Sequence, residues 1–154
     1  IAVDIEDEKL TLASDFGARA TVNGRDAATV VEAVRELSKG GVHVSLDALG
    51  HPDTCFHSIE NLRPRGRHVQ VGLMVGEHAT PQIPMAQVIR QELEIIGSHG
   101  IQAYRYQPML DMIAGGKLNP ARLVGQTISL AEVPEALMAM GRFQNVGVTV
   151  VTRF

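Results

Sequence analysis

The chain has 154 residues with a formal net charge of −3, and 45% of its residues are hydrophobic. This length suits one ordinary domain with its own core, and the hydrophobic share excludes a disordered chain. Because the net charge is negative and only 4% of the residues are aromatic, we expect no nucleic-acid binding. No apolar run reaches the roughly 20 residues of a membrane span. The single cysteine, Cys55, is typical of a reducing compartment, so we expect a cytoplasmic protein.

Apolar runs recur along the chain with helical patterns between them, which predicts an α/β fold with a parallel sheet. Several runs are continuously apolar, as is typical of strands that are buried on both faces. The predicted strands are Ile1–Ile5, Ala20–Asn23, Val42–Ala48, His68–Leu73, Leu93–Ser98 and Val146–Thr152.

Helical periodicity and stop signals predict the elements between the strands. The spacing of Val30, Val34 and Leu37 places them on one apolar face. Ser129 and Glu132 have the spacing of a capping box. The predicted helices are Asp7–Phe16, Ala27–Ser38, Asp53–Asn61, Met85–Glu92, Tyr104–Ala114 and Ala131–Met140.

Other local signals set boundaries in the middle of the chain. Asp53 or Thr54 is the expected N-cap of the third helix. Arg63-Pro64-Arg65-Gly66 predicts a turn into the next strand, and Met74–Pro84 predicts a loop. The alternation of strands and helices breaks near Asn119-Pro120, which we interpret as a weak boundary.

The first predicted strand ends on an acid, Asp4. In dinucleotide-binding folds a carboxylate at this place accepts hydrogen bonds from the adenosine ribose hydroxyls. The fingerprint G-x-G-x-x-G should precede it by about 20 residues, and the sequence begins at Ile1. We therefore expect the chain to be a portion of a longer protein. A carboxylate also repels the 2′-phosphate of NADP, and Ile5–Glu8 add negative charge and no Arg, so we expect NAD rather than NADP.

A second candidate segment, Ala48-Leu49-Gly50-His51, follows another predicted strand. Ligands of parallel sheets lie beyond the carboxyl ends of the strands, and a glycine such as Gly50 permits close backbone approach. His51 is weighed as a pyrophosphate contact against an ordinary surface histidine.

Taken in order, these motifs resemble the medium-chain zinc-dependent alcohol dehydrogenases. The resemblance implies a Rossmann-type doubly wound parallel sheet that lacks its first strand and glycine-rich loop. Because that strand is central in the family order 3-2-1-4-5-6, the two halves of the sheet would lack their joining strand. Residues 1–119 would form a partial NAD-binding domain, and residues 120–154 a strand-helix-strand segment that in the family returns toward the catalytic domain. The matching motifs are Asp4 with Lys9-Leu10, Gly40-Gly41-Val42, Asp47–Gly50, Leu62–Arg67, Val69–Gly72, Glu92–Ser98 and Gly147–Val151.

The resemblance also implies roles for individual residues. Asp4 and Lys9 would contact the adenosine ribose, and Ile5 would pack against the adenine. The backbone and apolar side chains near Gly72 and Ile96 would lie against the nicotinamide. The full set of expected cofactor contacts is Asp4, Ile5, Lys9, Ala48, Leu49, Gly50, His51, Val71, Gly72, Leu73 and Ile96.

The expected function follows from the same resemblance. The parent enzyme would transfer hydride between an alcohol or aldehyde and NAD, with zinc bound in an amino-terminal half that this sequence does not contain. We assign no catalytic residue and no metal site to the chain, which we expect to be inactive alone. A homodimer is plausible for the parent. The alternatives are a portion of a zinc-free quinone or enone reductase and an inert nucleotide-binding fragment.

Overall fold

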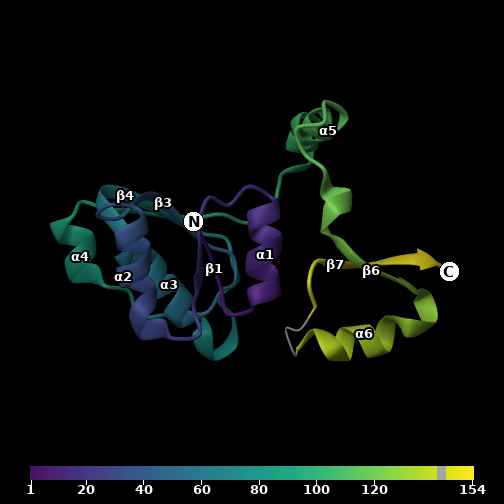
Figure 1. The fold of residues 1–154 in the computed structure, drawn as a ribbon, viewed down its shortest axis with the longest axis horizontal. Helices are drawn as coiled ribbons and strands as arrows, with labels where there is room; N and C mark the ends of the chain where they lie inside the picture. Colours follow the sequence, from purple (N-terminus) through teal and green to yellow (C-terminus); the bar gives the residue numbers. More distant parts are fainter. Residues whose placement is uncertain (142–144) are drawn as a thin grey trace. The chain divides into compact units, whose positions relative to one another are not determined.

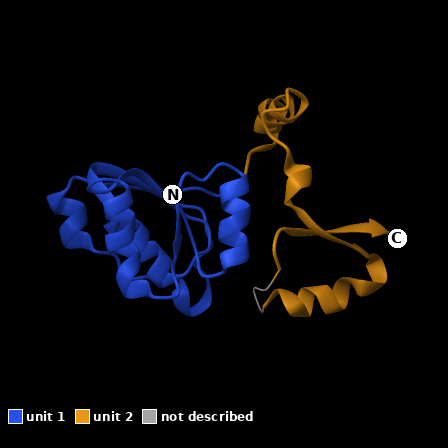
Figure 2. Ribbon diagram, in the orientation of Figure 1, with its two compact units in different colours: residues 1–100 blue, residues 101–154 orange. Residues whose placement is uncertain are grey.

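The structure is a computed structural model that describes residues 1–141 and 145–154. It contains two compact units, residues 1–100 and residues 101–154 (Figure 2). The units meet at Gly100 and Ile101, earlier in the sequence than the predicted boundary near Asn119-Pro120. The assignment of domains to residues 1–119 and 120–154 stays a prediction. No helix among the described residues is long and apolar enough to cross a bilayer.

Unit 1 alternates strands with helices along the chain, as the sequence predicts (Figure 1). The helices lie close to the positions expected from the apolar periodicity. The strands are β1 (Ala2–Asp4), β2 (Thr21–Asn23), β3 (Val42–Asp47), β4 (Leu62–Gln70) and β5 (Glu94–Gly97). The helices are α1 (Asp7–Asp15), α2 (Ala27–Leu37), α3 (Pro52–Glu60) and α4 (Met85–Arg90), with a 3-10 turn η1 (Gly76–His78).

The strands of unit 1 form two parallel pieces. β1 pairs with β2, and β3, β4 and β5 pair in that order. Among the described residues β1 and β3 are not hydrogen-bonded neighbours. This break is the one that the family topology predicts when the central strand is missing.

Capping groups and apolar faces explain α2 and α3. The Asp26 carboxylate accepts from the backbone N–H of Ala28, and Val30 and Val34 of α2 are buried. Helix α3 begins at Pro52 rather than at the expected Asp53, and its N-cap is His51. Proline suits the first helical position because the missing N–H has no intrahelical acceptor there.

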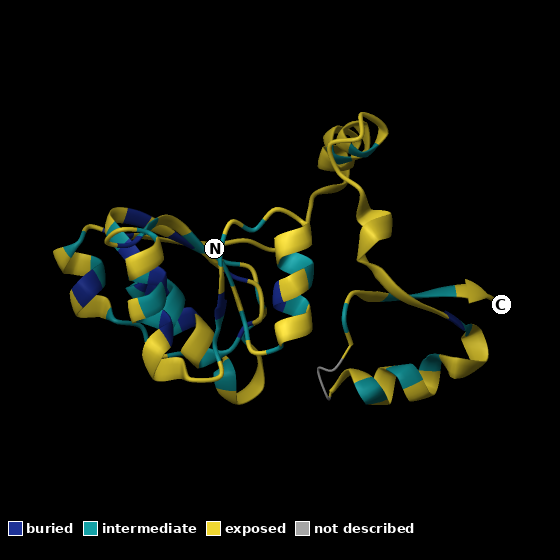
Figure 3. Cartoon of the chain, viewed as in Figure 1, coloured by how far each residue is buried: buried dark blue, intermediate teal, exposed yellow. Residues whose placement is uncertain are grey.

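The main core of unit 1 packs α3 onto the sheet. Cys55 and Ile59 of α3 form a buried cluster with Leu62 of β4 and with Leu93. Cys55 is therefore a small core residue that faces the sheet. In Figure 3 the buried positions gather on α2, α3, α4 and the neighbouring strands.

The prediction of a turn at Arg63–Gly66 is wrong. These residues belong to β4, which begins at Leu62. Leu62 pairs with Val42 and Arg67 pairs with Val44, so four residues of β4 bulge out against one residue of β3. Arg65 has a φ of 60° within this bulge. The Pro and Gly signal therefore marks an irregularity inside a strand rather than its start.

Burial of the strands on both faces is also not found. Val44 and Leu46 of β3 are 50% and 64% exposed. Helix α3 lies on the side of Ser45 and His68, because Ser58 of α3 contacts His68, and Val44 and Leu46 lie on the other side. The continuous apolar run of β3 therefore contains side chains that the rest of the described structure leaves exposed to solvent.

Unit 2 contains the elements η2 (Ala103–Arg105), α5 (Tyr106–Ala114), η3 (Pro120–Leu123), β6 (Val124–Ser129), η4 (Leu130–Glu132), α6 (Val133–Met140) and β7 (Val148–Arg153). β6 and β7 pair in parallel, and α6 lies between them in the sequence. The capping box of Ser129 and Glu132 is present. Ile128 is the buried hydrophobic residue among the described residues of this unit.

Truncation of Ile59 tests the position of the core. Ile59 is fully buried, so Ile59→Ala should lower the free energy of unfolding by about 2–5 kcal/mol. Ile89→Ala is the matched control because Ile89 is 73% exposed, and its effect should stay within about 0.5 kcal/mol. Urea unfolding followed by circular dichroism measures both values. Equal effects of the two substitutions would contradict the described core.

Candidate functional site

The carboxyl ends of β3, β4 and β5 lie level with one another. Asp47 pairs with Gln70, and Gln70 pairs with Gly97. One residue earlier, Val69 is the register partner of both Leu46 and Ile96. Because side chains alternate between faces, Leu46 and Ile96 lie on the face opposite to Asp47 and Gln70. The parallel register thus brings residues from three separate segments to one edge.

Asp47 connects the two turns that leave this edge. Its Oδ1 accepts from the backbone N–H groups of Leu49 at 2.8 Å and Gly50 at 3.0 Å. Its main-chain carbonyl accepts from the N–H groups of Val71 at 2.9 Å and Gly72 at 2.8 Å. One buried residue therefore holds the turn after β3 against the turn after β4.

Two glycines allow these turns to touch. A Cβ added to Gly72 would lie 2.1 Å from the N atom of Gly50, and one added to Gly50 would lie 2.3 Å from the carbonyl oxygen of Leu73. Gly50 also has a φ of 84°, which glycine adopts readily. No side chain larger than a hydrogen fits at either position without displacing backbone.

The predicted residues of the two turns are thus brought together, and several remain open to solvent. Leu49 and Leu73 are 58% and 62% exposed, and Ala48 and Val71 are also exposed. Gly50 is buried between the turns. The two turns therefore present exposed apolar side chains beside a close backbone contact.

His51, one of the expected cofactor contacts, is the N-cap of a helix in the structure. Its Nδ1 accepts from the backbone N–H of Asp53 at 3.2 Å, which caps α3. The His51 ring lies 5.0 Å from the ring of His78 of η1, centroid to centroid. A hollow beside it is lined by Pro52, Asp53, Phe56 and Gln82, of which the sequence marks only Asp53, as a possible N-cap.

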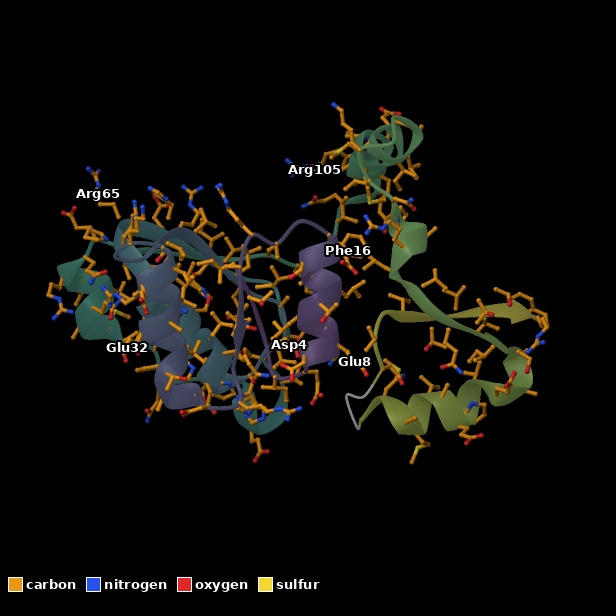
Figure 4. The ribbon with its side chains drawn as sticks, in the orientation of Figure 1. Asp4, Glu8, Phe16, Glu32, Arg65 and Arg105 are labelled. Carbon is orange, nitrogen blue, oxygen red and sulfur yellow. The ribbon has the colours of Figure 1, made fainter. Side chains whose placement is uncertain are left out.

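The other predicted residues lie at the end of β1. Asp4 is half-buried, and its Oδ1 accepts from the backbone N–H of Glu6 at 3.0 Å. Ile5 is 51% exposed, and Lys9 lies within α1, which follows. Figure 4 shows Asp4 at the start of the connection to α1. The structure thus gathers Asp4, Ile5 and Lys9 on the β1–β2 piece and the remaining predicted residues on the β3–β4–β5 piece.

Arg25 is the nearby residue that the sequence reading missed. Its Nε donates to the main-chain carbonyl of Ile5 at 2.7 Å, and its Nη2 lies 3.2 Å from a carboxylate oxygen of Glu6. The segment after Asp4 contains no Arg, but the fold supplies one from the turn after β2. Parallel pairing of Asp4 with Asn23 is the signal that could have found it, since it sets the two following turns side by side.

Within residues 1–141 and 145–154, three titratable groups have shifted pKa values. Burial lowers the pKa of His68, partly opposed by its hydrogen bond with Gln70 and by the charge of Asp47. Burial raises the pKa of the Cys55 thiol, and the charge of Asp47 raises it further. Hydrogen bonds from Ser129 lower the pKa of Glu132 in unit 2.

The chain was compared with known proteins. The model of a family described as zinc-binding dehydrogenase matches residues 1–115. An alcohol dehydrogenase of Geobacillus stearothermophilus is 30% identical over 140 residues, which cover 91% of this chain and 39% of that protein. The L-idonate 5-dehydrogenase (NAD(P)(+)) of Escherichia coli is 28% identical over 141 residues, covering 92% and 39%.

Solved structures give the same picture. The alcohol dehydrogenase of the archaeon Aeropyrum pernix superposes with a TM-score of 0.83 at 28% identity, covering 97% of this chain and 41% of that one. The chain therefore spans about two fifths of the length of these relatives. Within this chain, however, the similarity to the Aeropyrum pernix structure covers nearly every residue.

Replacement of Gly72 tests the contact between the turns. Gly72→Ala should lower the free energy of unfolding by about 3 kcal/mol, because its methyl group would overlap the Gly50 backbone. Gly97→Ala at the end of β5 is the matched control, since a Cβ there meets nothing within 4 Å. Its effect should stay within about 0.5 kcal/mol. Denaturant unfolding of both variants gives the comparison, and a tolerated Gly72→Ala would rule the contact out.

Proposed function

This chain belongs to the zinc-binding dehydrogenase family, and from that membership we propose that it is the cofactor-binding portion of an alcohol dehydrogenase-like enzyme. The whole protein would transfer hydride between an alcohol or aldehyde and NAD. The single observation that carries the proposal is the contact of the Gly50 and Gly72 turns at the carboxyl edge of β3 and β4. Ligands of parallel α/β sheets bind at this edge.

The residues of the chain fit a dinucleotide in two places. The carboxylate of Asp4 would accept hydrogen bonds from the adenosine ribose, with Ile5 against the adenine and Lys9 near the ribose. Val71 to Leu73 and Ile96 would lie against the nicotinamide. The turn from Ala48 to Gly50 would lie toward the adenine and the nicotinamide ribose, with His51 near the pyrophosphate. The bound cofactor would supply the hydride acceptor, and the residues of this chain would hold and orient it.

NAD is favoured over NADP by the charge at Asp4. A carboxylate accepts from a free 2′-hydroxyl and repels a 2′-phosphate. Arg25 lies near this place, but its guanidinium already contacts Glu6 and the Ile5 carbonyl. The E. coli relative carries both nucleotides in its name, so nucleotide choice has to be measured for this protein.

Zinc is assigned to a part of the whole protein outside this chain. Among the described residues no three His, Cys, Asp or Glu side chains cluster as metal ligands. Zinc held elsewhere would polarise the substrate oxygen. This chain would then contribute no catalytic residue, and alone it would be inactive. We further propose a cytoplasmic location, in keeping with the free thiol of Cys55, and a homodimer, for which β5 offers a sheet edge.

Assay of the whole protein tests this function. It should oxidise an alcohol with reduction of NAD, and removal of zinc by a chelator should abolish turnover. Metal-independent reduction of a quinone or enone with NADPH would instead support the zinc-free alternative. Binding of NADH without turnover of an alcohol, quinone or enone would favour the inert nucleotide-binding fragment.

Replacement of Asp4 tests the nucleotide choice. In the whole protein Asp4→Ala should lower kcat/KM for NAD by about 10- to 100-fold, because it removes hydrogen bonds to a charged acceptor. The value for NADP should stay level or rise, since the repulsion is lost. Glu32→Ala on α2 is a suitable control, because this exposed carboxylate lies apart from Asp4 (Figure 4). Equal losses with both nucleotides would refute the assigned role.

A further inference from the structure

A buried chain of hydrogen bonds lies beneath the two turns. His68 of β4 is fully buried. Its Nδ1 lies 3.1 Å from the hydroxyl of Ser58 on α3 and 3.3 Å from that of Ser45 on β3. Its Nε2 lies 3.1 Å from Oε1 of Gln70. The Gln70 amide in turn donates to Oδ2 of Asp47 at 2.8 Å.

The donor and the acceptor of each hydrogen bond in this series follow from the groups that can only accept. The Gln70 NH₂ group also donates to the Gly72 carbonyl at 2.9 Å. A carboxylate and a carbonyl can only accept, so both amide hydrogens of Gln70 are used and its Oε1 must face His68. Nε2 of His68 must then carry the proton, and Nδ1 accepts from the serine hydroxyls. Burial, which disfavours the charged ring, agrees with a neutral His68.

The series of hydrogen bonds ends at Asp47, the residue that bonds to both turns. Oδ2 of Asp47 receives Gln70, while Oδ1 receives the N–H groups of Leu49 and Gly50. The carboxylate is 3% exposed, so these donors replace water as its hydrogen-bonding partners. Displacement of any donor would leave a buried charge under-satisfied. The turn after β3 is therefore fixed by the interior of the sheet and not only by its own sequence.

We propose that Asp47, oriented by Gln70 and His68, is the positioning residue for the nicotinamide side of the cofactor site. It does not touch the cofactor itself. It sets the distance between the Leu49–Gly50 turn and the Gly72 turn, on which the dinucleotide would lie. This inference rests on the proposed function for its cofactor, whereas the hydrogen-bond directions rest on the geometry alone.

The tautomer of His68 tests the chain of bonds without any cofactor. In the whole protein with ¹⁵N-labelled histidine, long-range ¹H–¹⁵N spectra should show His68 neutral and protonated on Nε2. A His68→Gln variant assigns the signal. A ring protonated on Nδ1, or on both nitrogens at neutral pH, would overturn the proposal.

Two substitutions test the positioning role. In Asp47→Asn the side-chain NH₂ group must face a donor in either orientation. It meets the N–H groups of Leu49 and Gly50 in one and the Gln70 amide in the other. The substitution should weaken NADH binding about tenfold or more and speed hydrogen exchange at the Leu49 and Gly50 amides about as much. Gln70→Met keeps the side-chain volume but removes the hydrogen bonds to His68 and Asp47. It should therefore weaken NADH binding, and His68 should no longer be held in the tautomer protonated on Nε2.

Gln87→Leu is the matched control. Gln87 is also buried, and its amide donates to the carbonyls of Ile59 and Glu60 at the end of α3. It should lower thermal stability as Gln70→Met does, yet leave NADH affinity unchanged. Unchanged NADH affinity in both Asp47→Asn and Gln70→Met would overturn the positioning role alone. Failure of the unaltered whole protein to bind NADH would overturn the proposed function, and the cofactor role of Asp47 with it.

Discussion

The backbone contact between Gly50 and Gly72 is the constraint on which the arrangement at the sheet edge depends. Two connections leave adjacent strands, and both must pass through a space that admits no side chain. Asp47 can bond to the backbone of both connections only because they lie this close. The exposed apolar residues that flank the glycines then lie in turns that Asp47 holds together at the ends of two paired strands.

Much of this region follows from the sequence because its causes are local. The α/β alternation, the buried face of α2 and the placing of Gly50 after a strand rest on periodicity and on single-residue conformational preferences. Parallel pairing then brings the ends of β3 and β4 together without further information. The capping box at Ser129 and Glu132 is local in the same way.

Features that depend on residues distant in sequence were not found from the sequence. Arg25 reaches Ile5 and Glu6 only through the pairing of β1 with β2. The bonds of His68 with Ser58 and Gln70 depend on the packing of α3. At Arg63–Gly66 the turn signal was correct about irregular backbone but could not show that pairing with β3 resumes beyond it. The His51 cap of α3 is a local feature, but the sequence favours Asp53 or Thr54 as the cap instead.

The unpaired sides of β1 and β3 bear on how the chain behaves in solution. Each has a hydrogen-bonded neighbour on one side only among the described residues. A free strand side presents N–H and C=O groups to any extended chain that approaches it, and β3 adds the exposed Val44 and Leu46. Such a surface favours strand addition between copies and hence aggregation. Solubility of these residues on their own is therefore coupled to whatever extended segment occupies that place.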